Sequence, residues 1–165
     1  MRPASLPGGQ VVQRVPFDQT YLARSATWLQ DPELVWLIRS ATTFDAEGQR
    51  AWFDGLAARS DYAIWGLSCD GQPVGVIGIK DIGVDDGALY FMYVGERSHW
   101  RLGIGRWALR EIQAEIGSRG LRWVYGRIAQ HNTRSRQAHF ALGMLPLREE
   151  LDETVVRIGV DDPVG

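Results

Sequence analysis

Apolar residues recur at helical spacing in some stretches of the chain and in short β-rich runs in others. The runs predict six strands, at Val11–Phe17, Tyr62–Cys69, Pro73–Lys80, Ala88–Val94, Leu121–Ala129 and Thr154–Val160. Asp or Asn before an apolar stripe is a helix-start signal. The helices predicted in this way are Gln19–Leu29, a short one from Asp31-Pro32 through Ile38, Ala46–Ala58, a segment from the glycines near 104 to Ser118, and Asn132–Leu142.

Turn signals join these elements. Asp70-Gly71 is a strong hairpin signal, and Asp86-Gly87 is expected to form a second one before the strand at Ala88. Gly120 ends one helix, and Gly143 is placed at the C-terminal cap of another. Strands in a meander, mixed with helices, predict an α+β fold whose mixed, mostly antiparallel central sheet has about six or seven strands and is flanked by helices.

Length and composition limit the function classes. The chain has 165 residues, enough for one domain with its own core. We expect a flexible, Pro/Gly-rich N-terminus over residues 1–10 and a single domain over 11–162. The net charge of -2 gives no general attraction to nucleic acid or to an anionic membrane. No apolar run is long enough to cross a membrane, and the start lacks a signal-peptide core.

Cysteine and histidine usage adds two expectations. The single cysteine, Cys69, cannot form an internal disulfide, which suits a reducing cytoplasm. No zinc-ligand spacing is present, so we expect no metal site. We therefore expect a cytoplasmic protein that binds neither nucleic acid nor membrane.

The most informative segment is Trp100–Arg106, which follows an apolar strand and precedes the stripe Ile104, Ala108, Ile112 and Ile116. A strand that turns through two glycines into a helix presents unpaired N–H groups at the positive end of the helix dipole, and that arrangement binds phosphate. Arg97, Arg101 and Arg106 are expected to add positive charge. A dinucleotide fold is excluded because it needs a third glycine at position 108, where the chain has Ala. A P-loop needs Gly-Lys-Ser/Thr from Gly105 onward.

The segment resembles the acetyl-CoA loop of the Gcn5-related N-acetyltransferases (GNAT), with the pattern Arg/Gln-x-x-Gly-x-Gly/Ala. Gly103, Ile104 and Gly105 match, and Trp100 stands where Arg or Gln is usual. A Trp is similar to the branch that acetylates ribosomal-protein N-termini, aminosugars and polyamines, where Trp-Gly-Lys-Gly is common. Arg101 replaces the middle glycine of that run.

A second segment strengthens the resemblance. Asn132, Ser135, Gly143 and Met144 line up with the family's Asn-x-x-Ala/Ser…Tyr-x-x-x-Gly-Phe segment, and His139 falls where many members have tyrosine. The resemblance covers residues 60 to 150 well and the first 60 in outline. It implies the GNAT fold and transfer of the acetyl group of acetyl-CoA (coenzyme A) to a primary amine, by direct attack in a ternary complex.

The resemblance also implies which residues contact the cofactor. Backbone N–H groups near Tyr93, Val94 and Gly95, at the end of the fourth strand, correspond to those that polarise the thioester. Asn132 is expected both to cap its helix and to lie beside the pantetheine arm, with Ser135 nearby. The expected contacts of the phosphates are the loop residues Arg101, Leu102, Gly103, Ile104, Gly105 and Arg106.

Two side chains are candidates for proton transfer. Glu96, at the end of the strand, would accept the amine proton through water; the alternative is a solvated loop glutamate. His139 would protonate the departing thiolate if its pKa lay near 7; the alternative is a half-buried helix histidine.

Acceptor specificity is expected from the first 60 residues, with Trp28 and Trp36 as candidate contacts, and from Asp81. Aromatic faces pack on sugar rings and hold cations, but the acidic cluster expected for a polyamine is missing. The acceptor classes left open are an aminosugar-like small molecule and a protein N-terminus. A catalytically silent acyl-CoA-binding regulatory module is the alternative function. The weakly charged surface is compatible with a homodimer that forms through the late strands.

Overall fold

The structure of the protein is a computed structural model that describes residues 3–39 and 45–165. The chain forms two compact units. Unit one contains the chain up to Gly78 together with Met92–Ile104, and unit two contains Ile79–Phe91 and Gly105–Gly165. Strand β5 (Gly87–Val94) and helix α4 (Ile104–Ser118) each contribute residues to both units. Phe44 and its neighbours, residues 40–44, lie outside the described residues.

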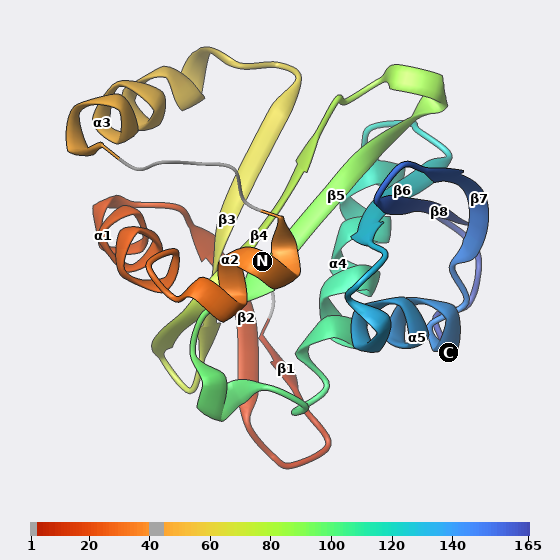
Figure 1. Cartoon of the computed structure of the whole chain (residues 1–165), viewed down its shortest axis with the longest axis horizontal. Helices are drawn as coiled ribbons and strands as arrows, with labels where there is room; N and C mark the ends of the chain where they lie inside the picture. Colours follow the sequence, from red (N-terminus) through yellow and green to blue (C-terminus); the bar gives the residue numbers. More distant parts are fainter. Residues whose placement is uncertain (1–2, 40–44) are drawn as a thin grey trace. The chain divides into compact units, whose positions relative to one another are not determined.

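Unit one holds strands β1 (Ala4–Ser5), β2 (Val11–Pro16), β3 (Tyr62–Cys69) and most of β4 (Gln72–Lys80). Between β2 and β3 come helices α1 (Gln19–Trp28), α2 (Pro32–Ile38) and α3 (Ala46–Gly55), followed by the 3-10 turn η1 (Leu56–Ala58). Asp18, Asp31 and Asp45 cap the three helices through their carboxylates, as the sequence predicts. Figure 1 shows β2, β3 and β4 side by side.

Two local features explain how this unit packs. Asp70 and Gly71 both take positive φ, which is the two-residue hairpin that the Asp-Gly signal predicts between β3 and β4. Helix α1 lies directly on β3, because a Cβ at Gly66 would fall 2.3 Å from the Tyr21 ring. Glycine at position 66 is therefore what allows the aromatic ring to sit against the strand.

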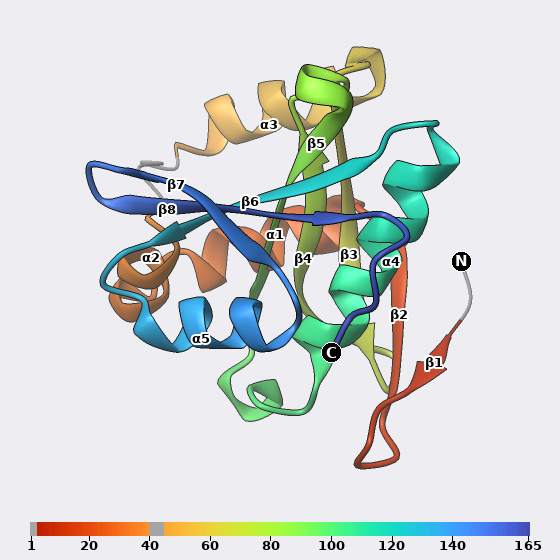
Figure 2. The same cartoon turned by 90° about the vertical axis from the view of Figure 1, so that its right-hand side faces the viewer.

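Unit two contains the start of β5 (Gly87–Val94), most of α4 (Ile104–Ser118), β6 (Trp123–Ala129), α5 (Thr133–Ala141), β7 (Leu145–Glu150) and β8 (Glu153–Gly159). Short 3-10 turns, η2 (Val84–Asp86) and η3 (Arg97–His99), flank β5. Strands β6, β8 and β7 lie side by side (Figure 2). The predicted α4 stripe is confirmed, since Ile104, Ala108, Ile112 and Ile116 are all buried.

The hydrogen-bonded strand order is β1-β2-β3-β4-β5-β6-β8-β7, in a mixed, mostly antiparallel sheet. The predicted fold class is confirmed. The parallel pair is β5 with β6, and its register joins Gly87–Leu89 to Trp123–Tyr125. The sheet has eight strands because β1 and β7 extend its two edges. Residues 4–5, inside the segment expected to be loose, pair with Val11 and Val12 of β2.

One turn differs from the sequence expectation. Asp86-Gly87 was expected to be a two-residue hairpin turn, but Gly87 has an extended backbone and begins β5. The reversal is spread over a longer loop in which Asp81, Gly83, Asp85 and Asp86 all take positive φ. Aspartate tolerates this conformation better than most side chains, so the loop needs few glycines.

Candidate active site

The loop before α4 has the backbone of an anion-binding turn. Gly103 takes φ +91°, and Ile104 starts a helix of fifteen residues. Because Gly103 has no side chain, it supplies no side-chain acceptor to the free N–H groups of the first helical turn. That turn contains Arg106 and no acidic residue, the reverse of the usual charge preference near a helix N-terminus. These features favour a bound anion.

Arg101 stands at a strained position in the same loop. Its φ is +68°, in the left-handed region that costs a non-glycine residue about 1–2 kcal/mol. This is the position at which the resembling sequences have glycine. Its side chain is exposed, so no burial offsets the strain. A strained backbone that keeps a charged side chain is a feature of functional sites.

Trp100 ties the loop to the end of β5. Its indole Nε1 donates a hydrogen bond of 2.8 Å to the carbonyl oxygen of Val94. This contact gives the unusual residue at position 100 a structural role, because the loop is fixed to the strand that precedes it.

Arg97 lies beside the loop, with its guanidinium carbon 5.4 Å from the ring centre of Trp100, and its charge is paired with carboxylates. Its guanidinium donates to both carboxylate oxygens of Asp31, at 2.8 to 3.0 Å, and pairs with Glu33 at 2.6 Å. These hydrogen bonds from Arg97 hold the pKa of the Asp31 carboxyl below its usual range. The position of Arg97 in the sequence, close to the loop, gave no sign of these partners in α2.

The end of β5 carries a β-bulge. The N–H groups of Gly95 and Glu96 both donate to the carbonyl oxygen of Val74, at 2.8 and 3.1 Å. The Gly95 N–H, one of the expected thioester-polarising groups, is therefore directed at β4. Successive residues of a strand point their backbone groups to opposite edges. The N–H of Val94 thus faces away from Val74, and it is the better placed of the predicted donors.

Trp28 is packed behind this bulge. A Cβ at Gly95 would fall 2.2 Å from Cγ of Trp28, so glycine is required for the indole to lie there. The Trp28 side chain is buried, and its Nε1 donates a 2.8 Å hydrogen bond to Oε1 of Glu96. Arg24 lies 3.8 Å from the same oxygen. Glu96, whose side chain is 37% exposed, is thus a carboxylate oriented through one of its two oxygens.

His139 belongs to a separate network in unit two. Its Nδ1 lies 2.6 Å from the carbonyl oxygen of Ser135, which can only accept, so Nδ1 carries the proton. The remaining nitrogen, Nε2, then accepts from the hydroxyl of Tyr90. Burial lowers the pKa of His139, an effect opposed by the bond to Ser135. The imidazole is therefore neutral at pH 7, and it has no free proton to donate from Nε2.

Tyr90 is the partner that sequence reasoning missed. It is buried in β5, and desolvation raises the pKa of its phenol, so it keeps its proton. Its position four residues before Val94 gave no reason to pair it with a helix near 139.

Asn132 caps α5, accepting from the N–H of Ser135 at 3.1 Å, as predicted.

The predicted acceptor residues are scattered. Trp28 is buried and committed to Glu96. Trp36 is 56% exposed on α2. Asp81 is an exposed turn residue with φ +54°, and its carbonyl accepts from Val84. Aspartate at position 81 is explained by the turn, because Asp tolerates the left-handed backbone found there.

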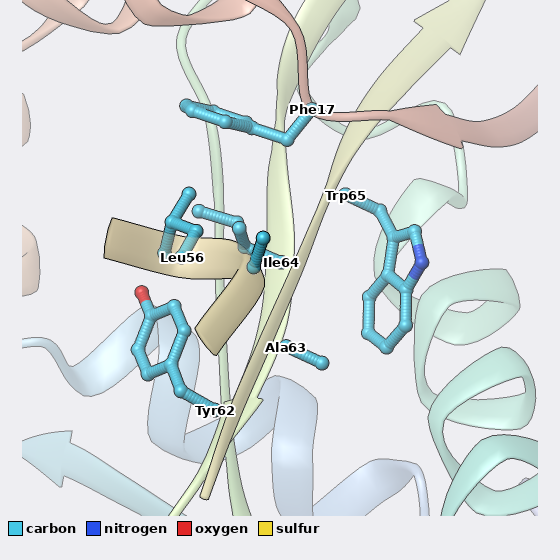
Figure 3. Close-up of a pocket in the computed structure, with 7 residues that line it drawn as sticks. Phe17, Leu56, Tyr62, Ala63, Ile64 and Trp65 are labelled. Atoms are coloured by element: carbon cyan, nitrogen blue, oxygen red, sulfur yellow. The ribbon is translucent and has the colours of Figure 1, made fainter. Parts of the chain in front are cut away.

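A different set of residues forms a cavity in unit one. The cavity, of about 240 Å³, is called here the aromatic pocket, and it is lined by Phe17, Leu56, Ala57, Tyr62, Ala63, Ile64 and Trp65. Figure 3 shows Phe17, Leu56, Tyr62 and Ile64 gathered on one side of β3, with Trp65 on the other. The sequence feature that could have indicated this cavity is the group of aromatic residues near positions 17, 52 and 62. Only the fold shows that they come together.

Two further findings concern the described part of the chain, residues 3–39 and 45–165. No cluster of His, Cys, Asp and Glu within it is arranged to hold a metal ion. None of its helices is long and apolar enough to cross a membrane.

Comparison with known proteins gives the family and the fold. Residues 15–145 match the family model described as an acetyltransferase (GNAT) domain. No curated protein matches the chain. Among solved structures, spermidine N-acetyltransferase from Vibrio cholerae, in complex with CoA and spermine, has a TM-score of 0.81 at 10% identity and covers 90% of this chain and 95% of that one.

Two other structures are similar over nearly their whole length. N-acetyltransferase PseH from Campylobacter jejuni, in complex with acetyl coenzyme A, has a TM-score of 0.68 at 14% identity, covering 90% of this chain and 98% of that one. The GNAT domain of S. lividans PAT has a TM-score of 0.75 at 15% identity and covers 96% of both chains. At these identities the likeness is one of fold.

Proposed function

Because the chain belongs to the GNAT family of acetyltransferases, which use acetyl-CoA as donor, we propose that it acetylates a primary amine by direct attack in a ternary complex. The observation that carries the proposal is the loop before α4. Its glycine cap, its strained Arg101 and its basic first turn form an anion site directly after β5. The acceptor classes supported by the sequence are an aminosugar-like small molecule and a protein N-terminus.

The loop fits the diphosphate of coenzyme A. The backbone at Gly103 is left-handed, and a Cβ at Gly105 would meet nothing within 4 Å, so the approach to the helix N-terminus is open. Gly103, Ile104, Gly105 and Arg106 would hold phosphate through N–H groups and charge, with Arg101 and Leu102 over them. Acetyl-CoA supplies an activated acyl group with a good leaving thiolate. Asn132 and Ser135, in unit two, stay predicted contacts of the cofactor.

Residues at the end of β5 would act on the reacting groups. The N–H of Val94, which points away from β4, would donate to the carbonyl oxygen on which negative charge develops. Tyr93 and Gly95 flank it and fix its direction. Glu96 would accept the proton of the attacking amine through water, using the oxygen that Trp28 leaves open.

His139 has a different role from the one expected. A neutral imidazole that already accepts from Tyr90 cannot protonate a thiolate. We assign it the role of holding the Tyr90 hydroxyl in unit two. The leaving thiolate then needs no protein acid, since it is stable enough to depart as an anion.

The homodimer is a further part of the proposal. Strand β7 is an edge of the sheet and carries exposed Leu145 and Leu147, with Leu151 just beyond it. Apolar side chains at an exposed edge favour association with a second copy. A mass measured by light scattering across micromolar concentrations checks this, and a monomer throughout would exclude the dimer.

Two measurements test the proposed function. Calorimetric titration with acetyl-CoA should give saturable binding, and thiol release across a panel of primary amines should then give turnover. Binding with no turnover on any amine would favour the alternative, a catalytically silent acyl-CoA-binding module. The absence of binding would overturn the assignment of the loop.

Arg101→Gly gives a sharper test of the loop. Removing the strained side chain should raise the free energy of unfolding by about 1 kcal/mol. The same change should weaken acetyl-CoA binding severalfold, with a loss that shrinks as salt increases because the contact is electrostatic. If the variant is more stable but binds acetyl-CoA as tightly as wild type, Arg101 does not contact the phosphates.

A further inference from the structure

We propose that the aromatic pocket of unit one binds the apolar tail of the amine acceptor, a single aromatic ring or a branched aliphatic group. The assignment rests on the proposed function and narrows its substrate class. The sequence pointed to Trp28, Trp36 and Asp81 for the acceptor. The structure instead supplies a cavity built from other aromatic residues.

The size of the pocket limits what can enter. Its volume is about 240 Å³. A water molecule takes about 30 Å³ in the liquid, so the pocket has room for roughly eight groups of that size. A phenyl ring with a short linker matches this volume, and so does a branched aliphatic side chain. A nucleotide sugar does not.

The chemistry of the walls sets which end of the acceptor enters. None of the residues that line the pocket is charged, and on the side of β3 where Phe17, Leu56 and Ile64 gather, Tyr62 carries the one polar side-chain group, its hydroxyl. An ammonium inside would lose its hydration without gaining a counter-charge. The face of Tyr62 is also already covered by Arg59, whose guanidinium carbon lies 4.6 Å from the ring centre. The carbon tail therefore enters, and the amine stays outside.

The walls are held in place by contacts between rings. The ring of Phe17 has its centre 5.9 Å from Trp52 and 6.1 Å from Phe53, and Trp52 meets Tyr62 edge-on at 6.2 Å. Such edge-to-face contacts stabilise one arrangement of the rings. A cavity formed in this way costs little to organise when a ligand binds.

The pocket lies beside helix α1 within unit one. The ring centre of Phe17, in the pocket wall, is 6.2 Å from that of Tyr21 in α1. Trp28, the last residue of the same helix, meets Tyr93 edge-on at 6.3 Å and donates to Glu96. An acceptor whose tail fills the pocket would direct its amine along α1 toward the proposed base.

An acceptor panel tests the proposal with the whole chain. We expect kcat/KM for 2-phenylethylamine and isoamylamine to exceed that for ethanolamine and spermidine by at least about tenfold, the value of burying a few methylene groups in an apolar pocket. A Phe-Gly-Gly peptide in the same panel distinguishes the two sources of such a tail. Preference for the peptide over 2-phenylethylamine would point to protein N-termini, and the reverse preference to a free aromatic amine.

Two substitutions at Leu56 alter the pocket in opposite directions. Leu56→Trp fills it and should lower kcat/KM for 2-phenylethylamine at least about tenfold, while that for ethanolamine stays within about twofold. Leu56→Ala enlarges it and should raise the preference for tryptamine over 2-phenylethylamine. The matched control is Val84→Trp, because Val84 is 58% exposed and lies in unit two. If Leu56→Trp fails to fold, Leu56→Ala carries the test.

A binding measurement distinguishes failure of this proposal from failure of the proposed function. Calorimetry with 2-phenylethylamine and CoA, which lacks the acetyl group, measures the pocket without turnover. Binding that Leu56→Trp abolishes would support the pocket even if no amine is acetylated. Turnover with equal kcat/KM for all amines, unchanged by either Leu56 variant, would overturn the pocket and leave the acetyltransferase assignment intact.

Discussion

Glu96 in unit one and His139 in unit two are both polar groups held by an aromatic side chain, yet the two arrangements leave different chemistry available. Trp28 donates its indole N–H to one oxygen of Glu96, and Tyr90 donates its hydroxyl to one nitrogen of His139. A carboxylate has a second oxygen with free lone pairs. The second nitrogen of His139 is occupied by the Ser135 carbonyl.

Exposure separates the pair further. The Glu96 side chain is 37% exposed and lies close to Arg24, so water can reach it. His139 is desolvated, which lowers its pKa and keeps it neutral. The comparison teaches that a titratable residue at a family's catalytic position is informative only with its hydrogen-bond partners. Glu96 retains an open acceptor, and His139 does not.

The largest effect is expected at Glu96 itself. Glu96→Gln keeps the shape and the bond from Trp28 but removes the basic oxygen. Turnover should fall about 10²-fold, the lower end for loss of a general base, with acetyl-CoA affinity unchanged. Steady-state kinetics with calorimetry checks both quantities. Wild-type turnover in this variant would mean that the amine loses its proton to water alone.

Trp28→Phe sharpens the same side of the comparison. The ring is retained against Gly95, while the N–H donor to Glu96 is lost. We expect kcat to fall three- to tenfold, because the partly exposed carboxylate keeps its hydration but loses its orientation. Combined with Glu96→Gln, the Trp28 change should add little. A full additional loss in the double variant would show that Trp28 acts on the reaction by another route.

The order of helices and strands was predictable because its signals are local. Asp18, Asp31 and Asp45 are helix caps that can be read from neighbouring residues, as can the Asp70-Gly71 turn. Strand β7 was missed because it contains Pro146 and charged residues, which an edge strand tolerates and a central strand does not.

The partners of site residues were less predictable, because they come from distant positions. Trp28 and Glu96 are 68 residues apart, and Tyr90 and His139 are 49 apart. Nothing in a single sequence links two residues that are this far apart, so their contact could not be predicted. The helix start at Ile104 could be predicted because the glycines of the preceding loop and the apolar stripe of α4 are contiguous in the sequence, while the phosphate role of the loop stays a prediction.

His139→Phe tests the other side of the comparison. Since the neutral imidazole moves no proton in the proposed reaction, turnover should stay within about threefold of wild type. The buried Tyr90 hydroxyl would lose its acceptor, so the free energy of unfolding should fall by about 1–3 kcal/mol. Urea denaturation and thiol-release assays measure the two effects on the same preparation.

A double variant distinguishes this explanation from poor packing. Adding Tyr90→Phe removes the unsatisfied hydroxyl, and loss of both partners costs less than loss of one. The double variant should therefore be at least as stable as His139→Phe alone. A drop in turnover near 10²-fold in His139→Phe, at unchanged acetyl-CoA affinity, would restore His139 as the acid and remove the contrast with Glu96.

The smallest effect is a pH dependence of stability. In the folded protein the pKa of His139 lies below its ordinary value of 6.5, so the neutral form is favoured by folding. The unfolded chain then binds more protons than the folded one at acidic pH. The stabilisation by His139 is therefore complete above about pH 6.5 and is lost as pH falls through the lowered pKa.

The Asp31 carboxyl, whose pKa is lowered by Arg97, also affects stability toward acid, so the His139 contribution has to be isolated by difference. The gap in unfolding free energy between wild type and His139→Phe should narrow as pH falls from 8 to 5, measured by urea denaturation. The Glu96→Gln variant serves as the control, since its own gap from wild type has no His139 component. A gap for His139→Phe that widens toward acid would mean that the imidazole is charged in the fold. The Tyr90 oxygen would then accept a hydrogen bond from Nε2–H of His139 instead of donating one, and the distinction drawn between the two sites would fail.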